Sequence, residues 1–327
     1  MPLRPDREKG TDMKIAVLDA ATLGEDLDLS PLDALGEVKV YPATPPEKVP
    51  ERLRGMDAAV INKVRLNGDN LRGLTELKLI CLAATGYDNV DTAFCRSSGI
   101  AVCNVAGYST DSVAQLTAAM ALYLVNRLGP YTAAVREGTY THGSTANLLT
   151  PVYHEMRGMT WGIAGYGRIG RRVGEIAAAL GCRVLCWNRS PRPEDPWVEL
   201  DELCRASDIL SVHLPLSGET RGLFSEERLR LLKKDCVFIN VARGAVADEK
   251  ALADALLQGR LGGLGVDVYS AEPFPEEHPF YALREHPNVC LTPHMAWGAL
   301  ETRQRCLREI VLNMASFLRG ERRNRVD

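Results

Sequence analysis

The chain alternates short apolar segments with longer polar segments that are compatible with helices. Early in the chain the apolar segments are Ile15–Leu18, Val38–Tyr41, Ala58–Ile61, Leu77–Ala83 and Ile100–Val105. Short strands that alternate with helices are typical of a parallel sheet covered on both faces. Roughly the first hundred residues therefore predict a small α/β domain. Because the first strand-like run begins at Met13, residues 1–12 are predicted to be a disordered extension.

A second series of the same kind begins at Met159. Its predicted strands are Met159–Ala164, Cys182–Trp187, Ile209–Leu214, Val237–Val241, Gly263–Val268 and Val289–Leu291. Helices are predicted at Ser225–Lys234 and Asp248–Gln258, with Ser225 and Asp248 as their N-caps. Six strands are the number found in a full dinucleotide-binding sheet.

Two long segments lie outside this alternation. Thr110–Leu128 is apolar on nearly all sides, which predicts a deeply buried helix capped by Asp111 or Ser112. Gly129–Tyr153 has no clear period, and we predict either a disordered loop or an arm that packs on a second subunit. Ala299–Leu318 predicts a final amphipathic helix.

The first predicted strand of the second series runs directly into Gly165-x-Gly167-x-x-Gly170 and then into a helix-compatible segment. Gly165 allows a tight turn, Gly167 allows the backbone to approach phosphates, and Gly170 allows close packing of helix and strand. The chain holds 28 glycines, so the spacing alone is weak evidence. Its position between a strand and a helix predicts a dinucleotide site.

Composition narrows the class of protein. A chain of 327 residues suggests about two domains, and a net charge of −3 does not favour nucleic acid as the main partner. No apolar run reaches the roughly 18 residues of a membrane span, and the first ten residues lack the apolar core of a signal peptide. The nine cysteines are scattered, which predicts buried thiols in a reducing cytoplasmic compartment and no metal site.

Three residues that can do chemistry each follow a predicted strand of the second series. Arg243, Glu272 and His294 should therefore lie at one sheet edge, where such folds bind ligands. Each residue taken singly has an ordinary alternative: Arg243 a surface ion pair, Glu272 a position in a turn, and His294 a position in a loop. A nicotinamide or flavin site can transfer electrons only if the protein supplies a proton donor or acceptor and orients the substrate, and these three residues are candidates for those tasks.

These motifs resemble the D-2-hydroxyacid dehydrogenase family, most closely its glycerate dehydrogenase/hydroxypyruvate reductase branch, from Met13 onward. The resemblance is carried by Ala84–Asp91, Val102–Ala114, Gly165–Gly170, Val212–Leu216, Asn240–Gly244, Asp267–Pro273 and Pro293–Trp297. It implies an oxidoreductase that transfers hydride between NAD(P)H and a small 2-ketoacid, with hydroxypyruvate and glyoxylate giving D-glycerate and glycolate.

The resemblance also implies a fold of two doubly wound parallel-sheet domains. A Rossmann-type NAD(P)-binding domain, residues 108–297, is expected as an insertion into a flavodoxin-like substrate-binding domain, residues 1–107 plus 298–327. The two crossings between them are expected to form a hinge. A homodimer through the cofactor domain is expected on the same basis.

Roles for the catalytic residues follow from the resemblance. It makes His294 the general acid–base, Glu272 its charged partner and Arg243 the group that binds the substrate carboxylate and polarises the carbonyl. Backbone amides near Thr85 and Gly86 are expected to bind the substrate. Three residues after His294, Trp297 is expected to border the substrate pocket.

The resemblance implies a larger set of cofactor contacts. Asp267 is expected to orient the nicotinamide carboxamide and Pro215 to line the cleft. The full set is Gly165, Gly167, Arg168, Ile169, Gly170, Asn188, Arg189, Ser190, Pro215, Thr220, Val241, Ala242 and Asp267.

One position departs from the NAD pattern. Asn188 stands where an acidic residue usually binds the ribose 2′-hydroxyl, and Arg189 and Ser190 follow it. Without a carboxylate to repel a 2′-phosphate, and with a guanidinium to bind it, NADP(H) is favoured. A solvated arginine beside a site that takes NAD(H) is the alternative.

Two competing functions stay open on the sequence. One is a general D-2-hydroxyacid dehydrogenase for a different 2-ketoacid. The other is a dinucleotide-sensing binding protein on the same scaffold, for which an intact acid–base set is unnecessary.

Overall fold

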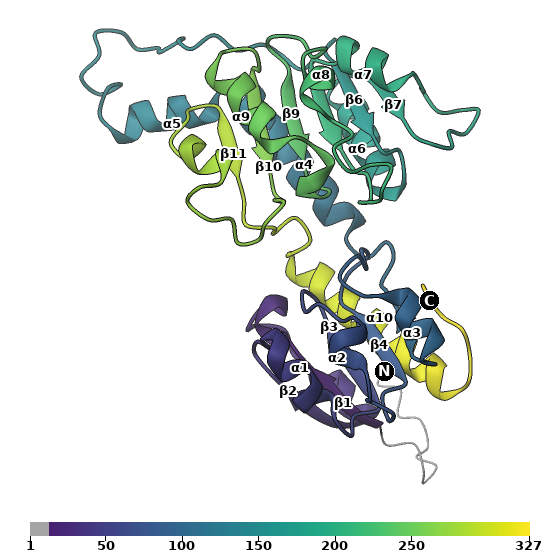
Figure 1. The fold of residues 1–327 in the computed structure, drawn as a ribbon. Coiled ribbons are helices and arrows are strands. Elements are labelled where there is room, and N and C mark those ends of the chain that lie inside the picture. The colour runs from purple at the N-terminus through teal and green to yellow at the C-terminus, as the bar shows by residue number, and fades with distance from the viewer. Residues whose placement is uncertain (1–12) are drawn as a thin grey trace. The chain divides into compact units, whose positions relative to one another are not determined.

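The computed structural model describes residues 13–327, so the extension predicted at residues 1–12 lies outside the described residues. The chain divides into two compact units (Figure 1). Unit 1 runs to Tyr108 and resumes at Gly298–Asp327, and unit 2 is the insertion Ser109–Trp297. Both sheets are parallel throughout, as the alternating pattern predicted.

The sheet of unit 1 has the strand order β2-β1-β3-β4-β5, which is the predicted flavodoxin-like order. Its strands are β1 (Met13–Val17), β2 (Gly36–Val40), β3 (Ala58–Ile61), β4 (Leu79–Leu82) and β5 (Ala101–Cys103). Its α-helices are α1 (Val49–Leu53), α2 (Gly68–Leu71), α3 (Thr92–Ser97) and α10 (Leu300–Leu318). The last of these confirms the predicted final helix.

The sheet of unit 2 has the order β11-β10-β9-β8-β6-β7 and confirms the six predicted strands. They are β6 (Thr160–Ala164), β7 (Arg183–Trp187), β8 (Ile209–Val212), β9 (Val237–Asn240), β10 (Gly263–Val266) and β11 (Val289–Leu291). A dinucleotide-binding sheet usually carries a further strand outside its second one. Here only a single bridge, from Cys186 to Trp197, occupies that place.

Helices cover both faces of this sheet because successive strand residues point to opposite sides. Ile209 packs in the core that includes α4 and α6, whereas Leu210 packs in the core that includes α7, α8 and α9. In Figure 1, α9 lies in front of the sheet and α4 behind it. Their bounds are α4 (Thr110–Val125), α6 (Arg168–Ala179), α7 (Leu200–Ala206), α8 (Glu226–Leu229) and α9 (Glu249–Leu257).

The long helix α4 is buried over most of its apolar residues, as predicted, but its cap prediction was wrong. Its N-cap is Ser109, and no side chain caps the helix. The hydroxyl of Ser112 instead donates to the carbonyl of Ala296, at 2.5 Å. Asp111, the other predicted cap, forms an ion pair with Arg172 at 3.1 Å. Both side chains therefore serve tertiary contacts.

Two further predictions about helices need correction. The segment Gly129–Tyr153, predicted to be irregular, contains most of helix α5 (Leu128–Arg136). α5 and the segment after it extend away from the sheet of unit 2 (Figure 1). The helix predicted at Ser225–Lys234 is only the short α8, although Ser225 caps it as predicted, and Asp248 caps α9.

Candidate active site

The ends of three neighbouring strands bring the predicted catalytic residues to one sheet edge. Arg243 lies three residues after β9, Glu272 lies in the segment after β10, and His294 lies three residues after β11. Because β9, β10 and β11 are adjacent and parallel, their carboxyl ends meet at the same edge. The edge that the sequence predicted is therefore formed.

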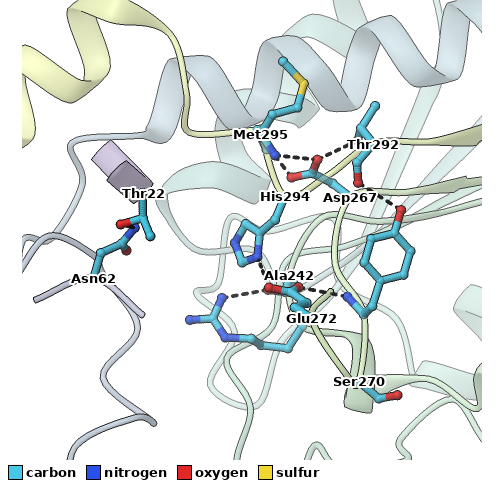
Figure 2. A network of polar contacts seen from close by, with 12 residues as sticks. Thr22, Asn62, Ala242, Asp267, Ser270, Glu272, Thr292, His294 and Met295 are labelled. Carbon is cyan, nitrogen blue, oxygen red and sulfur yellow. Dashed lines mark hydrogen bonds and ion pairs between the residues drawn. The ribbon is translucent and has the colours of Figure 1, made fainter. Parts of the chain in front are cut away.

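His294 and Glu272 form a hydrogen-bonded pair, with 2.7 Å between Nδ1 and Oε2 (Figure 2). The other carboxylate oxygen of Glu272 accepts the backbone N–H of Tyr269 at 3.0 Å. An ionised carboxylate only accepts, so Nδ1 carries a proton and Nε2 is the nitrogen that can exchange one with a substrate. The side chains are 21% and 29% exposed, so both reach solvent while remaining held.

The segment around His294 is held by the buried carboxylate of Asp267 (Figure 2). One oxygen accepts the Thr292 hydroxyl at 2.5 Å and the N–H of Met295 at 2.8 Å, and the other accepts the N–H of Ala296 at 2.9 Å. Burial raises the pKa of Asp267, and these hydrogen bonds oppose that shift. His294 itself has φ +54, a left-handed conformation that this loop enforces. The sequence did not indicate this holding role, and the predicted cofactor contact of Asp267 stays a prediction.

Arg243 lies in a loop that buried Asn240 holds. The Asn240 amide donates to the carbonyl of Arg243 at 2.9 Å, and its oxygen accepts the N–H of Ala242 at 3.0 Å. The guanidinium donates to the carbonyl of Ala242 at 2.9 Å. Gly244 follows, and a Cβ there would lie 2.1 Å from the carbonyl carbon of Tyr269. The Arg243 loop therefore packs directly on the segment that leads to Glu272.

The glycine turn after β6 has the geometry that a pyrophosphate requires. Gly165 has φ +98, and a Cβ on Gly170 would lie 2.1 Å from the carbonyl oxygen of Gly165. No protein atom lies within 4 Å of a Cβ built on Gly167, so packing does not explain that glycine, whereas an approaching ligand does. Helix α6 then starts without a capping side chain and without an acidic residue in its first turn. The first backbone N–H groups of α6, which include those of Arg168 and Ile169, therefore lack a side-chain cap and fit a dinucleotide phosphate.

The segment after β7 carries the residues predicted to select the cofactor. The carbonyl of Asn188 accepts the indole N–H of Trp197 at 3.1 Å, and the Asn188 amide lies 3.4 Å from the carbonyl of Ser190. Arg189 forms an ion pair with Glu219 at 2.7 Å, and the two side chains are 78% and 70% exposed. Glu219 was missed on the sequence, because it lies 30 residues from Arg189 with no motif linking them.

The remaining predicted cofactor residues lie at the ends of β8 and β9. The Thr220 hydroxyl donates to the carbonyl of Pro215 at 2.6 Å and accepts the N–H of Ser217 at 2.8 Å, which closes the loop on itself. Val241 is buried and Ala242 half-buried, directly before Arg243. Their contacts with a cofactor stay predictions.

The predicted substrate-binding residues of unit 1 follow β4. The Thr85 hydroxyl donates to the carbonyl of Val105 at 2.8 Å, and the carbonyl of Thr85 accepts the amide of Asn104 at 2.7 Å. Gly86 is half-buried beside it. In unit 2, the half-buried Trp297 is the last residue, three after His294.

Comparison with known proteins identifies the family. Residues 118–296 match the model of the D-isomer specific 2-hydroxyacid dehydrogenase NAD-binding domain. The chain is 35% identical to a glycerate dehydrogenase of Methylorubrum extorquens, over 96% of this chain and 99% of that protein. It is also 35% identical to a hydroxypyruvate reductase of Blautia hydrogenotrophica, over 94% and 98% of the two chains. The chain belongs to the D-isomer specific 2-hydroxyacid dehydrogenase family.

Solved structures agree with this membership. An acyclic imino acid reductase in complex with NADPH and D-Arg has a TM-score of 0.87 at 28% identity, over 96% of this chain and all of that chain. A D-lactate dehydrogenase of Aquifex aeolicus, complexed with NAD and lactic acid, has a TM-score of 0.84 at 29% identity, over 94% and 96% of the two chains. The present chain is thus a 2-ketoacid/2-hydroxyacid oxidoreductase with a nicotinamide dinucleotide cofactor.

Further features of the described residues concern metal binding, membrane spans and thiols. Within residues 13–327, no set of three or more histidine, cysteine or carboxylate side chains is arranged to hold a metal ion. No helix in the same range has both the length and the apolar character to cross a membrane. All nine cysteines are free thiols. Cys290 is half-buried and the others are buried.

Proposed function

We propose that this chain reduces hydroxypyruvate and glyoxylate to D-glycerate and glycolate with NAD(P)H. The observation that carries the proposal is the 2.7 Å pair of His294 and Glu272 beside Arg243, in the same unit as the glycine turn. The names of the relatives support the choice of substrates, since they include glycerate dehydrogenase, hydroxypyruvate reductase and glyoxylate reductase.

Each catalytic side chain has a defined task in this proposal. The imidazolium of His294 donates the Nε2 proton to the ketone oxygen, and its neutral form accepts that proton in the reverse direction. Glu272 stabilises the imidazolium by its negative charge and fixes the proton on Nδ1. The fork of Arg243 binds the substrate carboxylate and polarises the carbonyl. The nicotinamide supplies the hydride when it is bound.

The rest of the proposed substrate site comes from other segments of the chain. We propose that backbone amides near Thr85 and Gly86 bind the substrate carboxylate and that Trp297 limits the size of the side chain. The held conformation of the Thr85 loop supports the first assignment, because a preorganised loop binds an anion at lower entropic cost.

For the cofactor we propose a preference for NADP(H) over NAD(H). Because residue 188 is asparagine, it brings no carboxylate that would repel a 2′-phosphate. The exposed guanidinium of Arg189 can bind that phosphate. Glu219 opposes this preference, since it neutralises Arg189 and adds a negative charge near the phosphate site. An exposed ion pair contributes only about 0–1 kcal/mol, so a phosphate can replace the carboxylate.

Assembly and location are proposed in the same way. We propose a homodimer formed through unit 2. Apolar side chains on α5 and the segment after it support this, because they are largely exposed: Val135 at 60%, Leu149 at 72%, Val152 at 70% and Tyr153 at 48%. The nine free thiols support a reducing compartment, such as the cytoplasm.

The test is steady-state kcat/KM for hydroxypyruvate, glyoxylate and pyruvate with NADPH and with NADH, followed by the loss of nicotinamide absorbance. We expect hydroxypyruvate with NADPH to give the highest value. A preference for NADH would refute the phosphate-binding role of Arg189 and leave the mechanism standing. The absence of turnover with all pairs, combined with tight cofactor binding, would instead support a dinucleotide-sensing protein.

A further inference from the structure

A second histidine–carboxylate pair, Glu249 and His278, lies in unit 2 outside the residues assigned above. His278 Nε2 and Glu249 Oε2 are 2.9 Å apart, and the side chains are only 5% and 10% exposed. The same carboxylate accepts the backbone N–H of Ser270 at 2.8 Å and also the Ser270 hydroxyl. Glu249, the first residue of α9, thus anchors the segment that leads to Glu272.

The protonation of His278 follows from its two partners. Its Nδ1 accepts the backbone N–H of Phe280 at 3.2 Å, so Nδ1 carries no proton. Nε2 therefore carries the proton and donates it to Glu249. The ring also packs edge-on against Tyr269, with centroids 6.0 Å apart, and at a tilt of 35° against Phe274, with centroids 5.1 Å apart. Both nitrogens and the ring faces are used to hold this segment in place.

Tyr269 and Ser270 connect this pair to the catalytic residues. The N–H of Tyr269 binds Glu272 at 3.0 Å, and its hydroxyl donates at 2.9 Å to the carbonyl of Thr292, which also accepts the N–H of His294. The close approach at Gly244 brings the Arg243 loop against the same two residues. In Figure 2, Ser270 lies below Glu272 and His294 lies above it. One dipeptide therefore contacts all three catalytic segments.

We propose that Glu249 and His278 are positioning residues that hold Tyr269–Ser270 and thereby set the geometry of the Glu272–His294 pair. The inference rests on the proposed function, since it gives these two residues a part in the same reaction. Neither side chain touches the reacting atoms in this account. Their effect passes through the N–H of Tyr269, which orients the Glu272 carboxylate toward His294.

Two substitutions separate this positioning from folding. Glu249→Gln keeps the shape of the side chain. In the variant, however, an amide NH₂ group replaces a carboxylate oxygen that accepts hydrogen bonds in the parent, so two donors face each other. His278→Asn removes the donor to Glu249. His278 is the N-cap of the 3-10 helix Pro279–Leu283, and asparagine at that position still accepts the N–H of Phe280. The loop that carries Glu272 should become mobile in both variants.

Matched controls exist in the same unit. His286→Asn changes a histidine whose Nδ1 likewise accepts a backbone N–H, that of Asn288 at 3.2 Å. Glu226→Gln changes the first residue of α8, whose carboxylate pairs with the exposed Arg230. Both controls should retain the kinetics of the parent protein.

The experiment measures kcat, KM for hydroxypyruvate and the dissociation constant of the preferred cofactor on the full chain, per mole of folded protein. We expect kcat to fall about tenfold in Glu249→Gln and His278→Asn, with KM and the dissociation constant changed less than about twofold. The reason is that misplaced catalytic groups lower the rate of the chemical step without removing a binding contact. A loss of thermal stability with unchanged kcat would reduce the pair to a structural element and overturn the proposal.

Amide hydrogen exchange of Tyr269 gives a readout that does not need turnover. In both variants its N–H should exchange at least about tenfold faster than in the parent, since its bond to Glu272 is loosened. Unchanged exchange would overturn the positioning role whatever the activity. A parent protein that shows no turnover, together with faster exchange in the variants, would instead refute the proposed function and leave the positioning of Glu272 intact.

Discussion

The two ends of the six-stranded sheet differ in how they hold their functional side chains. At the β9–β11 end, His294 and Glu272 are 21% and 29% exposed, and buried Asp267 ties the backbone after His294 to β10. At the β7 end, Arg189 and Glu219 are 78% and 70% exposed and meet in one ion pair. The side chains at the first end are held by several hydrogen bonds, whereas Arg189 and Glu219 are joined by one exposed ion pair.

Proton transfer and cofactor selection therefore need different degrees of precision in the placement of side chains. Proton transfer needs a donor and an acceptor at hydrogen-bond distance, about 2.6–3.2 Å, and the contacts of buried Asp267 hold the His294 segment for it. Recognition of a 2′-phosphate needs charge near the ribose, and an exposed ion pair of about 0–1 kcal/mol adapts to it. We therefore expect substitutions at the first end to change kcat and those at the second end to change cofactor affinity.

The largest effect is expected at His294. His294→Asn keeps the left-handed backbone, which asparagine tolerates, and removes the acid–base group. We expect kcat to fall about 10³-fold with the cofactor dissociation constant unchanged. Stopped-flow reduction of hydroxypyruvate measures the first quantity and cofactor fluorescence the second. Turnover within threefold of the parent would remove His294 from proton transfer.

Arg243→Lys should come next. Lysine keeps the charge but loses the planar fork, so bidentate binding of the substrate carboxylate is lost. We expect kcat/KM for hydroxypyruvate to fall about 10²-fold, while cofactor binding is retained. A fall confined to cofactor affinity would place Arg243 in the cofactor site instead.

A histidine between the two ends of the sheet, His213, should make stability depend on pH. It follows β8, and its backbone packs against the turn at Gly165. Burial lowers its pKa to about 3, from 6.5. The unfolded chain then binds a proton that the folded chain excludes, so the free energy of unfolding falls as pH decreases from 6.5 toward 3. The slope from this group should approach roughly 1.4 kcal/mol per pH unit.

The measurement compares urea unfolding of the parent and of His213→Gln at several pH values. The glutamine variant should lose less stability than the parent between about pH 6 and pH 4, since it lacks the titrating group. Parallel curves would show that His213 is solvated enough to be protonated in the folded protein.

Arg189→Ala is expected to have a smaller effect. The affinity for NADPH should fall about fivefold and that for NADH by less than twofold, because only the former has a 2′-phosphate. Isothermal titration with each dinucleotide measures both. Equal losses would refute the phosphate contact.

Glu219→Gln should show the smallest effect, and in the opposite direction. Removal of its charge releases Arg189 and ends the repulsion of a 2′-phosphate, so NADPH affinity should rise about twofold with NADH affinity constant. Glu194→Gln, at an exposed carboxylate near Arg192, serves as the control. Lower NADPH affinity in the Glu219 variant would contradict the competition.

The sequence predicted those parts that periodicity and local chemistry determine. Alternating apolar segments placed all six strands of unit 2, and residues that follow strands placed Arg243, Glu272 and His294 at one edge. The cap of α4 was missed because tertiary contacts occupy Asp111 and Ser112. Helix α5 was missed because its segment has weak periodicity.

The family resemblance implied the contact between Glu272 and His294, but other contacts between residues distant in the sequence were not predicted. Glu249 meets His278 across 29 residues, and Arg189 meets Glu219 across 30. Nothing local marks either pair, because each joins two segments that follow different strands. The positions of functional residues were therefore predictable, whereas the contacts that hold or compete with them were not.

The most direct test of hydride transfer assisted by His294 uses NAD(P)H that carries deuterium at both C4 positions of the nicotinamide and follows where the deuterium goes. Reduction of hydroxypyruvate by the parent protein should give D-glycerate with deuterium at C2, and His294→Asn should give almost none in the same time. Unlabelled product, L-glycerate, or equal amounts from both proteins would contradict a hydride transfer assisted by His294 at the β9–β11 edge.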